Sequence, residues 1–324
     1  MAPVALRIKA PIDSLAEADP LIAAGADELF CAVRLGETSC SCPRAEVRED
    51  KVCLSGLDEL DALVAFAHGR GVKVQVALND PRARTASLTQ QLVRANLGRL
   101  ESSGIDAVIV STLAVLRLVQ RQTKLPIVAG SYFAAINPEA IAFLEHLGVV
   151  GVILERQVAL ADLQAIAAAK PEVELGVFIL ASACRSLCLY CHRSALSPSP
   201  GEQGVHLCHL PLRVTPSDPH CGAPPADELR AMARRLRMPR HGCGLCAIPT
   251  LHRYGITVAK IVGRGHDTAL KVAHVQMLRA ALDALAAGRD GDGYFELARE
   301  LFQHTLRRPC NREDCYYPHL LGGS

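Results

Sequence analysis

Thirteen cysteines are the residues of this chain whose type and spacing could do chemistry. Seven of them fall within one stretch: Cys184, Cys188, Cys191, Cys208, Cys221, Cys243 and Cys246. Thiolates bind zinc and iron-sulfur clusters in sets of four, because four soft ligands complete a tetrahedral shell or cap the irons of a cubane. The stretch therefore offers more ligands than one site needs.

The composition indicates a folded chain. Half of its 324 residues are hydrophobic, and 35 basic residues stand against 33 acidic ones, which excludes a disordered chain, a collagen-like chain and a strongly basic nucleic-acid coat. We expect a cytoplasmic protein, because the N-terminus lacks a secretory signal and no run reaches the roughly 18 apolar residues of a membrane span. Thiols stay reduced there, so the cysteines indicate metal or redox chemistry rather than disulfides.

A repeated unit of helix, glycine and short apolar run predicts the scaffold that positions these cysteines. The glycine suits a left-handed residue just past a helix, and the apolar run suits a strand buried on both faces. Five copies carry this glycine: Gly25, Gly71, Gly104, Gly148 and Gly255. Further runs at 5–9, 126–130 and 173–180 bring the number of strands to eight. Helical patterns at 56–69, 87–100 and 267–287 lie between strands.

Eight parallel strands predict an α/β fold, a (β/α)8 TIM-like barrel, with a doubly wound sheet as the alternative. We expect the barrel over residues 1–305, with a cysteine-rich insertion at 181–255 after the seventh strand and a C-terminal tail at 306–324. No nucleotide-binding glycine motif occurs. Long irregular segments are usually functional or disordered, and the cysteines favour a functional insertion.

The local spacing of the cysteines is compatible with two kinds of metal site. Cys184, Cys188 and Cys191 have the CxxxCxxC spacing of radical SAM enzymes, but the motif follows the seventh strand instead of the first. Only 133 residues remain after it. Alternatively, two CxxC pairs, Cys188 with Cys191 and Cys243 with Cys246, have good spacing for zinc.

Several segments together resemble the U32 peptidase-like family, which includes UbiU and UbiV of the ubiquinone pathway and RNA-hydroxylation proteins. The similarity runs from about residue 22 to 284 and rests on five segments: 24–30, 68–79, 104–111, 152–156 and 260–264. The resemblance implies a 4Fe-4S cluster. It also implies oxygen-independent hydroxylation of an aromatic ring or nucleobase, with an anionic hydroxyl donor such as prephenate.

The family's cluster spacing implies four cofactor-binding, metal-ligating residues: Cys184, Cys191, Cys208 and Cys243. The first two have six residues between them, the second and third have sixteen, and the fourth lies twelve before Gly255. Two neighbours, Cys188 and Cys246, are local rivals for these positions.

Three basic residues lie where barrel enzymes place anion-binding groups, at the ends of the sixth and eighth strands. Arg156, Lys260 and Arg264 are therefore candidate substrate-binding residues, with rim salt bridges as the alternative role. No catalytic residue can be named. Neither a Gly-x-Ser-x-Gly elbow nor a His-Glu-x-x-His helix occurs, so nothing in the residues supports the peptidase chemistry of the family label.

Two other functions and a second metal site stay open. The chain could be a non-catalytic, cluster-bearing subunit of a heterodimer with a second family member, or a peptidase as the label suggests. An arginine strip at 230–240 could hold an RNA backbone. Five more cysteines could contribute to a second metal site: Cys40, Cys42, Cys53, Cys310 and Cys315.

Overall fold

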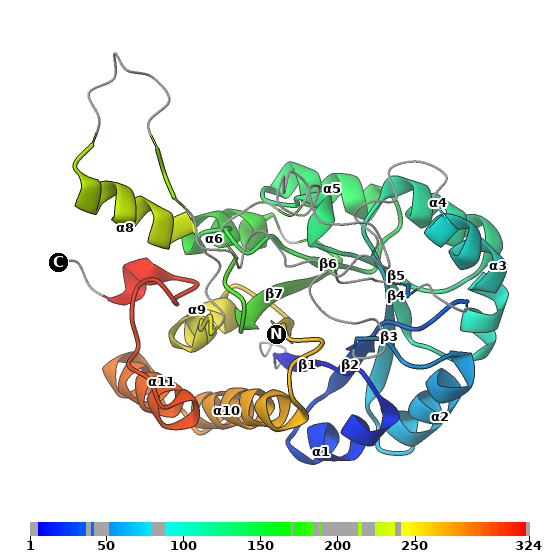
Figure 1. Ribbon diagram of the computed structural model, residues 1–324, viewed down its shortest axis with the longest axis horizontal. Helices are drawn as coiled ribbons and strands as arrows, with labels where there is room; N and C mark the ends of the chain where they lie inside the picture. Colours follow the sequence, from blue (N-terminus) through cyan, green and yellow to red (C-terminus); the bar gives the residue numbers. More distant parts are fainter. Residues whose placement is uncertain are drawn as a thin grey trace.

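Eight parallel strands close into a barrel in chain order, and β8 pairs with β1 (Figure 1). The computed structural model describes residues 6–36, 40–41, 52–79, 88–169, 171–184, 188, 213–215, 224–236 and 241–321. The strands are β1 (Arg7–Pro11), β2 (Glu28–Cys31), β3 (Lys73–Leu78), β4 (Ala107–Val110), β5 (Ile127–Ala129), β6 (Gly151–Ile153), β7 (Glu174–Leu180) and β8 (Val258–Ile261). The predicted TIM-like barrel is confirmed.

Helices surround the strands as the sequence pattern predicts (Figure 1). They are α1 (Ala18–Ala23), α2 (Leu57–His68), α3 (Leu88–Ser102), α4 (Leu113–Gln122), α5 (Pro138–His146), α6 (Leu160–Ala168), α8 (Ala226–Leu236), α9 (Ile248–Arg253), α10 (Thr268–Ala286) and α11 (Gly291–Leu306). Short 3-10 helices include η1 (Leu15–Glu17), η3 (Ser131–Phe133), η5 (Leu245–Ala247) and η6 (Pro318–Leu321). Among the helices that the structure describes, none is both long and apolar enough to cross a membrane.

The five glycines of the repeated unit have the backbone conformation that the sequence predicts. Their φ angles lie between +72° at Gly255 and +105° at Gly25, in the left-handed region that a side chain disfavours. Gly25 also has Arg279 packed against it, at 2.9 Å from where a Cβ would lie. These five residues lie just past α1, α2, α3, α5 and α9 and turn the chain into the next strand.

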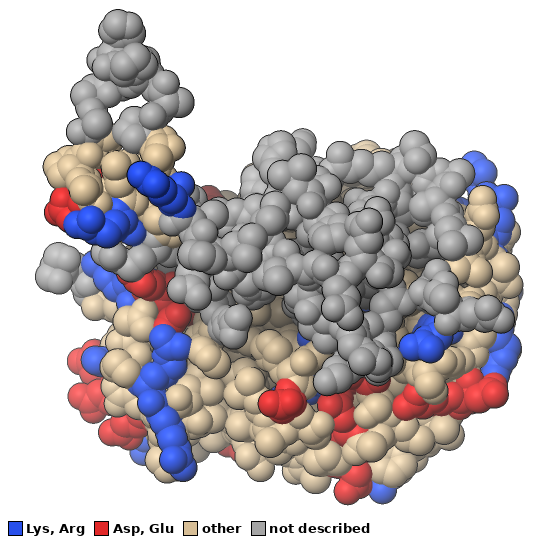
Figure 2. Space-filling view, viewed as in Figure 1, with Lys and Arg blue, Asp and Glu red and all other residues tan. Residues whose placement is uncertain are grey.

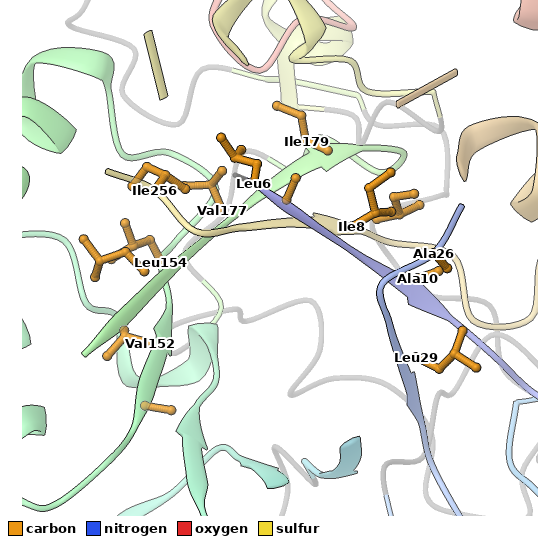
Figure 3. Packing of buried hydrophobic residues seen from close by; sticks show 14 of the residues in the cluster. Leu6, Ile8, Ala10, Ala26, Leu29, Val152, Leu154, Val177, Ile179 and Ile256 are labelled. Atoms are coloured by element: carbon orange, nitrogen blue, oxygen red, sulfur yellow. The ribbon is translucent and has the colours of Figure 1, made fainter. Parts of the chain in front are cut away.

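Side chains that alternate along the strands pack into two separate hydrophobic clusters. Ile8 and Ala10 of β1 and Ile179 of β7 point outward, into the apolar layer under the helices (Figure 3). Phe30 and Phe178 belong to a second cluster, made by the residues that point into the barrel. The closed sheet thus buries both faces, which explains the nearly continuous apolar strands.

Charged side chains fill the barrel end where the strands begin. The Lys9 ammonium lies 3.0 Å from Glu28 Oε2 and donates to Gln75 Oε1 at 2.9 Å. Arg7 pairs with Glu28 and with Glu174 at 2.6 Å each. Burial opposes the charge of Glu28, but Lys9 and Arg7 hold its pKa below the usual value. Paired charges therefore occupy the part of the barrel interior next to the strand starts.

A buried imidazole on α10 predicts a loss of stability in acid. His274 is 1% exposed, and neither ring nitrogen has a hydrogen-bond partner among the residues described. Burial, assisted by His266 and His241, lowers its pKa from 6.5 to about 4. As the pH falls from 6.5 to about 4, His274 of the unfolded chain binds a proton that His274 of the folded chain does not bind. About 3 kcal/mol of stability is lost over this range.

The His274→Leu variant is expected to lose less stability over the same pH range. Urea unfolding between pH 7 and pH 4 measures the effect, with His304→Leu, at an exposed position of α11, as the matched control. If His274→Leu and the wild type lose equal stability in acid, the buried imidazole is not the cause.

Candidate functional site

A buried lysine marks the mouth of the barrel, the end where the strands finish. Lys260 of β8 is 6% exposed. Its ammonium lies 4.0 Å from the ring centroid of Phe30 and 5.7 Å from that of Phe178. Both rings belong to the inward-pointing cluster, so the cation is held by aromatic faces inside the mouth.

Arg156, just beyond β6, brings a second cation to the same rings. Its guanidinium carbon lies 4.0 Å from the centroid of Phe178, and Nη1 donates to Cys188 Sγ at 3.1 Å. Its Nε is buried and has no hydrogen-bond partner in the part of the chain that the structure describes. Burial works against the charge, but Cys188, Tyr316 and Cys184 raise the pKa of Arg156 above its ordinary value. The side chain therefore carries a permanent charge and an unused donor.

Cys188 is held from three directions. Its amide donates to Glu155 Oε1 at 2.6 Å, and its sulfur lies 3.4 Å from Ser131 Oγ besides the contact with Arg156. Burial raises the pKa of the Cys188 thiol, and Arg156 opposes that rise. Burial also raises the pKa of Glu155. The arrangement fixes a thiol beside a cation at the mouth.

Arg264 follows β8 at the rim. It is 7% exposed, and Nη1 donates to the carbonyl of Val52 at 3.3 Å. The next residue, Gly265, donates its amide to Asp13 Oδ2 at 2.5 Å. Arg264 therefore ties the rim to the segment before α2.

Beside Arg264, Lys271 of α10 is buried between two carboxylates. It pairs with Asp13 and, at 2.7 Å, with Glu17. Glu17 also accepts from Thr268 Oγ1 at 2.8 Å and from the Asp13 amide at 2.9 Å. Burial raises the pKa of Asp13, while Lys271 and Arg264 oppose that rise. This network fastens the ends of β1 and β8 together.

Two of the four implied cluster ligands lie within the residues described. Cys184 follows a turn with positive φ at Ala181 (61°) and Ser182 (44°), and its carbonyl accepts from Gln157 Nε2 at 2.7 Å. Cys243 is buried and pairs with Leu180 at the end of β7. Cys191 and Cys208 lie outside the described residues, so the ligand set stays a prediction.

Tyr316 connects the C-terminal segment to this rim. Its hydroxyl donates to the carbonyl of Ala181 at 2.6 Å, next to the turn that presents Cys184. Burial raises its pKa, with Arg156 opposing and the charges of Cys184 and Cys243 adding to the rise. The residue therefore stands near both described members of the implied ligand set.

The structure joins Cys40 to Cys53 in a disulfide, whereas the sequence analysis favoured reduced cysteines. The pairing has a geometric reason: Arg34 forms a bridge with Cys40 and Val33 forms one with Leu54, so the two ends of this loop meet beyond β2. The Cα atoms of the pair are 6.2 Å apart, a distance that a disulfide spans. Cys42 lies outside the described residues.

The arginine strip begins on α8, the helix that extends beyond the barrel wall in Figure 1. Figure 2 shows basic side chains (blue) on this helix, and Arg230 is exposed. The side chains from Arg234 to Arg240 lie outside the described residues, so RNA binding by the strip stays a prediction.

The family model described as Peptidase family U32 matches residues 13–320. This protein belongs to peptidase family U32. Its barrel resembles the solved U32 peptidase Mk0906 with a TM-score of 0.50 and 18% sequence identity, over 81% of this chain and 95% of that one. No protein of curated function matches the chain.

Other barrels are less similar. Rubisco from Pyrococcus horikoshii has a TM-score of 0.48 at 12% identity, over 94% of this chain and 64% of that one. Dihydropteroate synthase from Thermus thermophilus has a TM-score of 0.42 at 14% identity, over 87% and 94%. The 18% identity with Mk0906 shows the fold alone, so the function of this U32 chain has to be argued from its own residues.

The mouth of this U32 barrel also contains residues that the motif analysis missed. Glu155 and Ser131 hold Cys188, and Asp13 pairs with Lys271. One signal was present in the sequence: Asp13 and Glu155 each lie two residues beyond the end of a strand, at the rim where barrel sites form. Nothing in the sequence brings Ser131 to a cysteine 57 residues away.

Proposed function

We propose that this U32 protein holds a 4Fe-4S cluster at the barrel mouth. There it would support oxygen-independent hydroxylation of an aromatic ring or nucleobase, alone or as one half of a heterodimer with a second family member. One observation carries the proposal: the thiols of Cys184 and Cys188 lie near the guanidinium of Arg156. Soft thiols suit iron, and a fixed cation stabilises the negative charge of a thiolate-bound cluster.

Three thiolates would come from Cys184, Cys191 and Cys208. For the fourth position the family spacing implies Cys243, and Cys188 and Cys246 are its rivals. Four thiolates complete the protein ligation of a cubane cluster, which when bound would supply iron for redox chemistry or oxygen transfer at the mouth.

The cations at the mouth favour an anionic cosubstrate, such as a prephenate-like carboxylate. Arg156 offers a buried Nε donor, and Lys260 adds a second positive charge on the same ring of Phe178. A carboxylate binds such groups through charge-assisted hydrogen bonds. Arg264, the third candidate from the sequence, donates through Nη1 to the Val52 carbonyl.

The Arg156→Gln variant is expected to bind prephenate at least about tenfold more weakly, because a hydrogen bond to a charged group contributes roughly 1.5 to 3 kcal/mol. Anaerobic titration calorimetry on the full chain measures the affinity. Arg121→Gln, at an exposed position of α4, is the matched control. Equal affinity of Arg156→Gln and the wild type would show that Arg156 does not bind the cosubstrate.

A peptidase is the second candidate, because the matched family and the solved relative Mk0906 are both described as peptidases. The two functions differ in their need for iron. Hydrolysis of casein or of a peptide library by iron-free protein, undiminished in Cys184→Ala, would favour the peptidase and contradict the hydroxylation proposal.

A further inference from the structure

Two polar side chains lie side by side at the mouth of the barrel, at the ends of β3 and β4. Asn79 directly follows β3, and Ser111 directly follows β4. The register of these strands pairs Leu78 with Val110, so the next residue of each strand, Asn79 and Ser111, falls in one row. Neighbouring strands are about 4.8 Å apart, so both side chains can contact one small ring.

Both side chains point into the mouth. Ala77 and Ile109, two residues earlier on the same strands, belong to the inward-pointing cluster. Because side chains along a strand alternate between its two faces, Asn79 and Ser111 point the same way as Ala77 and Ile109. The polar pair therefore lies over an apolar layer, at the end where barrel enzymes bind their ligands.

The polar atoms of this pair are buried and unused. Ser111 is 4% exposed, and its Oγ has no hydrogen-bond partner among the residues described. Oδ1 of Asn79 is also buried and has no partner within the described ranges. A buried polar atom without a partner destabilises the fold, and such atoms are rare. Two of them in one row at the mouth indicate a ligand that supplies the missing hydrogen bonds.

Gly130, directly after β5, lies against the Asn79 amide. The register of β4 and β5 pairs Val110 with Ala129, which places Gly130 in the same row as Ser111. A Cβ at Gly130 would lie 3.4 Å from Asn79 Nδ2 and 3.0 Å from the Val110 carbonyl oxygen. Because glycine adds no side chain at this position, it does not cover the amide from the side of β5.

We propose that Asn79 and Ser111 form a binding subsite for an uncharged planar ring with an amide edge, an N–H group beside a C=O group. The Asn79 carboxamide would accept from the N–H through Oδ1 and donate to the C=O through Nδ2, a bidentate contact of the kind that Asn makes with adenine. The Ser111 hydroxyl, which can donate or accept, would contact the next polar atom of the ring. A phenol brings a single oxygen to these contacts, so an amide-edged ring is expected to bind more tightly.

The subsite would hold the ring that is hydroxylated, and this role rests on the proposed function. Lys260 lies on β8 and Arg156 just beyond β6, so the anionic hydroxyl donor and the uncharged ring would be bound by different strands of one mouth. The binding contacts themselves contain no iron. Binding of an amide-edged ring by protein that holds no iron after reconstitution would keep the subsite and contradict the proposed function, so the two failures are distinguishable.

Thermal unfolding of the full chain tests whether the Ser111 hydroxyl is unused. Ser111→Ala is expected to keep or raise the melting temperature, because the hydroxyl that it removes is buried and unpartnered in the described part of the chain. A ligand-binding serine can be lost without harm to the fold, whereas a structural serine cannot.

Ser41→Ala is the matched control for Ser111→Ala. Ser41 is also buried, but its Oγ donates to the Ala77 carbonyl at 2.8 Å and accepts from the Val33 amide at 3.0 Å. The control should lower the melting temperature by about 2 °C or more. A comparable loss in Ser111→Ala would show that its hydroxyl serves the fold and would overturn the subsite.

Ligand-observed NMR titration of the full-length protein tests the class of ligand, with 1-methyluracil as the probe. We expect the wild type to bind it more tightly than phenol. Asn79→Leu should bind it at least about tenfold more weakly, because the hydrogen-bonding groups of the ring are left unpaired. Gln122→Leu, at an exposed position of α4, is the control and should bind it like the wild type.

A second probe keeps the test valid if Asn79→Leu fails to fold. In 1,3-dimethyluracil a methyl group replaces the remaining N–H, so the wild type should bind this ring at least about tenfold more weakly than 1-methyluracil. Three results would overturn the assignment: no binding of 1-methyluracil, equal binding of the two uracils, or tighter binding of phenol.

Discussion

Replacing Cys184 by alanine is expected to remove the iron-sulfur cluster. Cys184 follows the turn after β7, where Gln157 holds its carbonyl and its thiol lies near Arg156. Loss of a metal-ligating thiolate should lower iron and sulfide content by more than about tenfold, because even outer-shell changes cost that much affinity. Iron and acid-labile sulfide in anaerobically purified protein measure the effect.

Cys31→Ala is the control for this prediction, since its thiol is buried on β2 and donates to the Gln75 carbonyl at 3.8 Å. It should retain the cluster. The same assay separates two candidates for the fourth ligand: loss in Cys243→Ala with retention in Cys188→Ala supports the family spacing, and the reverse supports Cys188. A cluster retained in Cys184→Ala would contradict the ligand set itself.

Lys271→Met is expected to destabilise the protein by about 3 to 5 kcal/mol, the usual cost of removing one partner from a buried ion pair. Lys271 is 1% exposed and is the shared partner of Asp13 and Glu17. Without it, two carboxylates are left buried where β1 and β8 meet. Denaturant unfolding at neutral pH measures the difference in free energy.

Arg253→Met is the control for Lys271→Met, because Arg253 pairs with Asp290 at 3.6 Å in an exposed position. Its loss should cost at most about 1 kcal/mol. Adding Asp13→Asn to Lys271→Met should recover part of the stability, since one uncompensated charge is removed. Similar losses in Lys271→Met and Arg253→Met would show that the buried network contributes little.

The barrel was predictable because its signals are local. Each unit ends in a glycine that needs a positive φ, as Gly71 and Gly148 do, and the apolar run that follows is long enough for one strand. Such patterns depend on backbone sterics and on burial of the strands within the chain. Five such units and three further apolar runs predict eight strands, and the structure shows that these close into a barrel.

The site could be predicted only in part. Arg156 and Lys260 lie at the mouth as the strand ends indicate, and they share the ring of Phe178. Arg264 lies at the rim but bonds the carbonyl of Val52, a contact across 212 residues. Contacts between residues so far apart in the sequence depend on how the loops fold back onto the barrel. The spacing of residues along the sequence does not determine that path.

The cysteines illustrate the same limit. Spacing alone could not pair Cys40 with Cys53, because that pairing depends on two backbone bridges beyond β2. It also could not place Cys315 beside Cys243, since the C-terminal segment returns past the whole of α10 and α11. Function inferred from the order of cysteines therefore needs the fold to show which of them share a site.

Iron and acid-labile sulfide per chain, measured on wild-type protein purified without oxygen, test the central claim most directly. We predict about four iron and four sulfide, the content of one cubane cluster. Protein that folds but carries neither iron nor sulfide, even after anaerobic reconstitution, would contradict the proposed function.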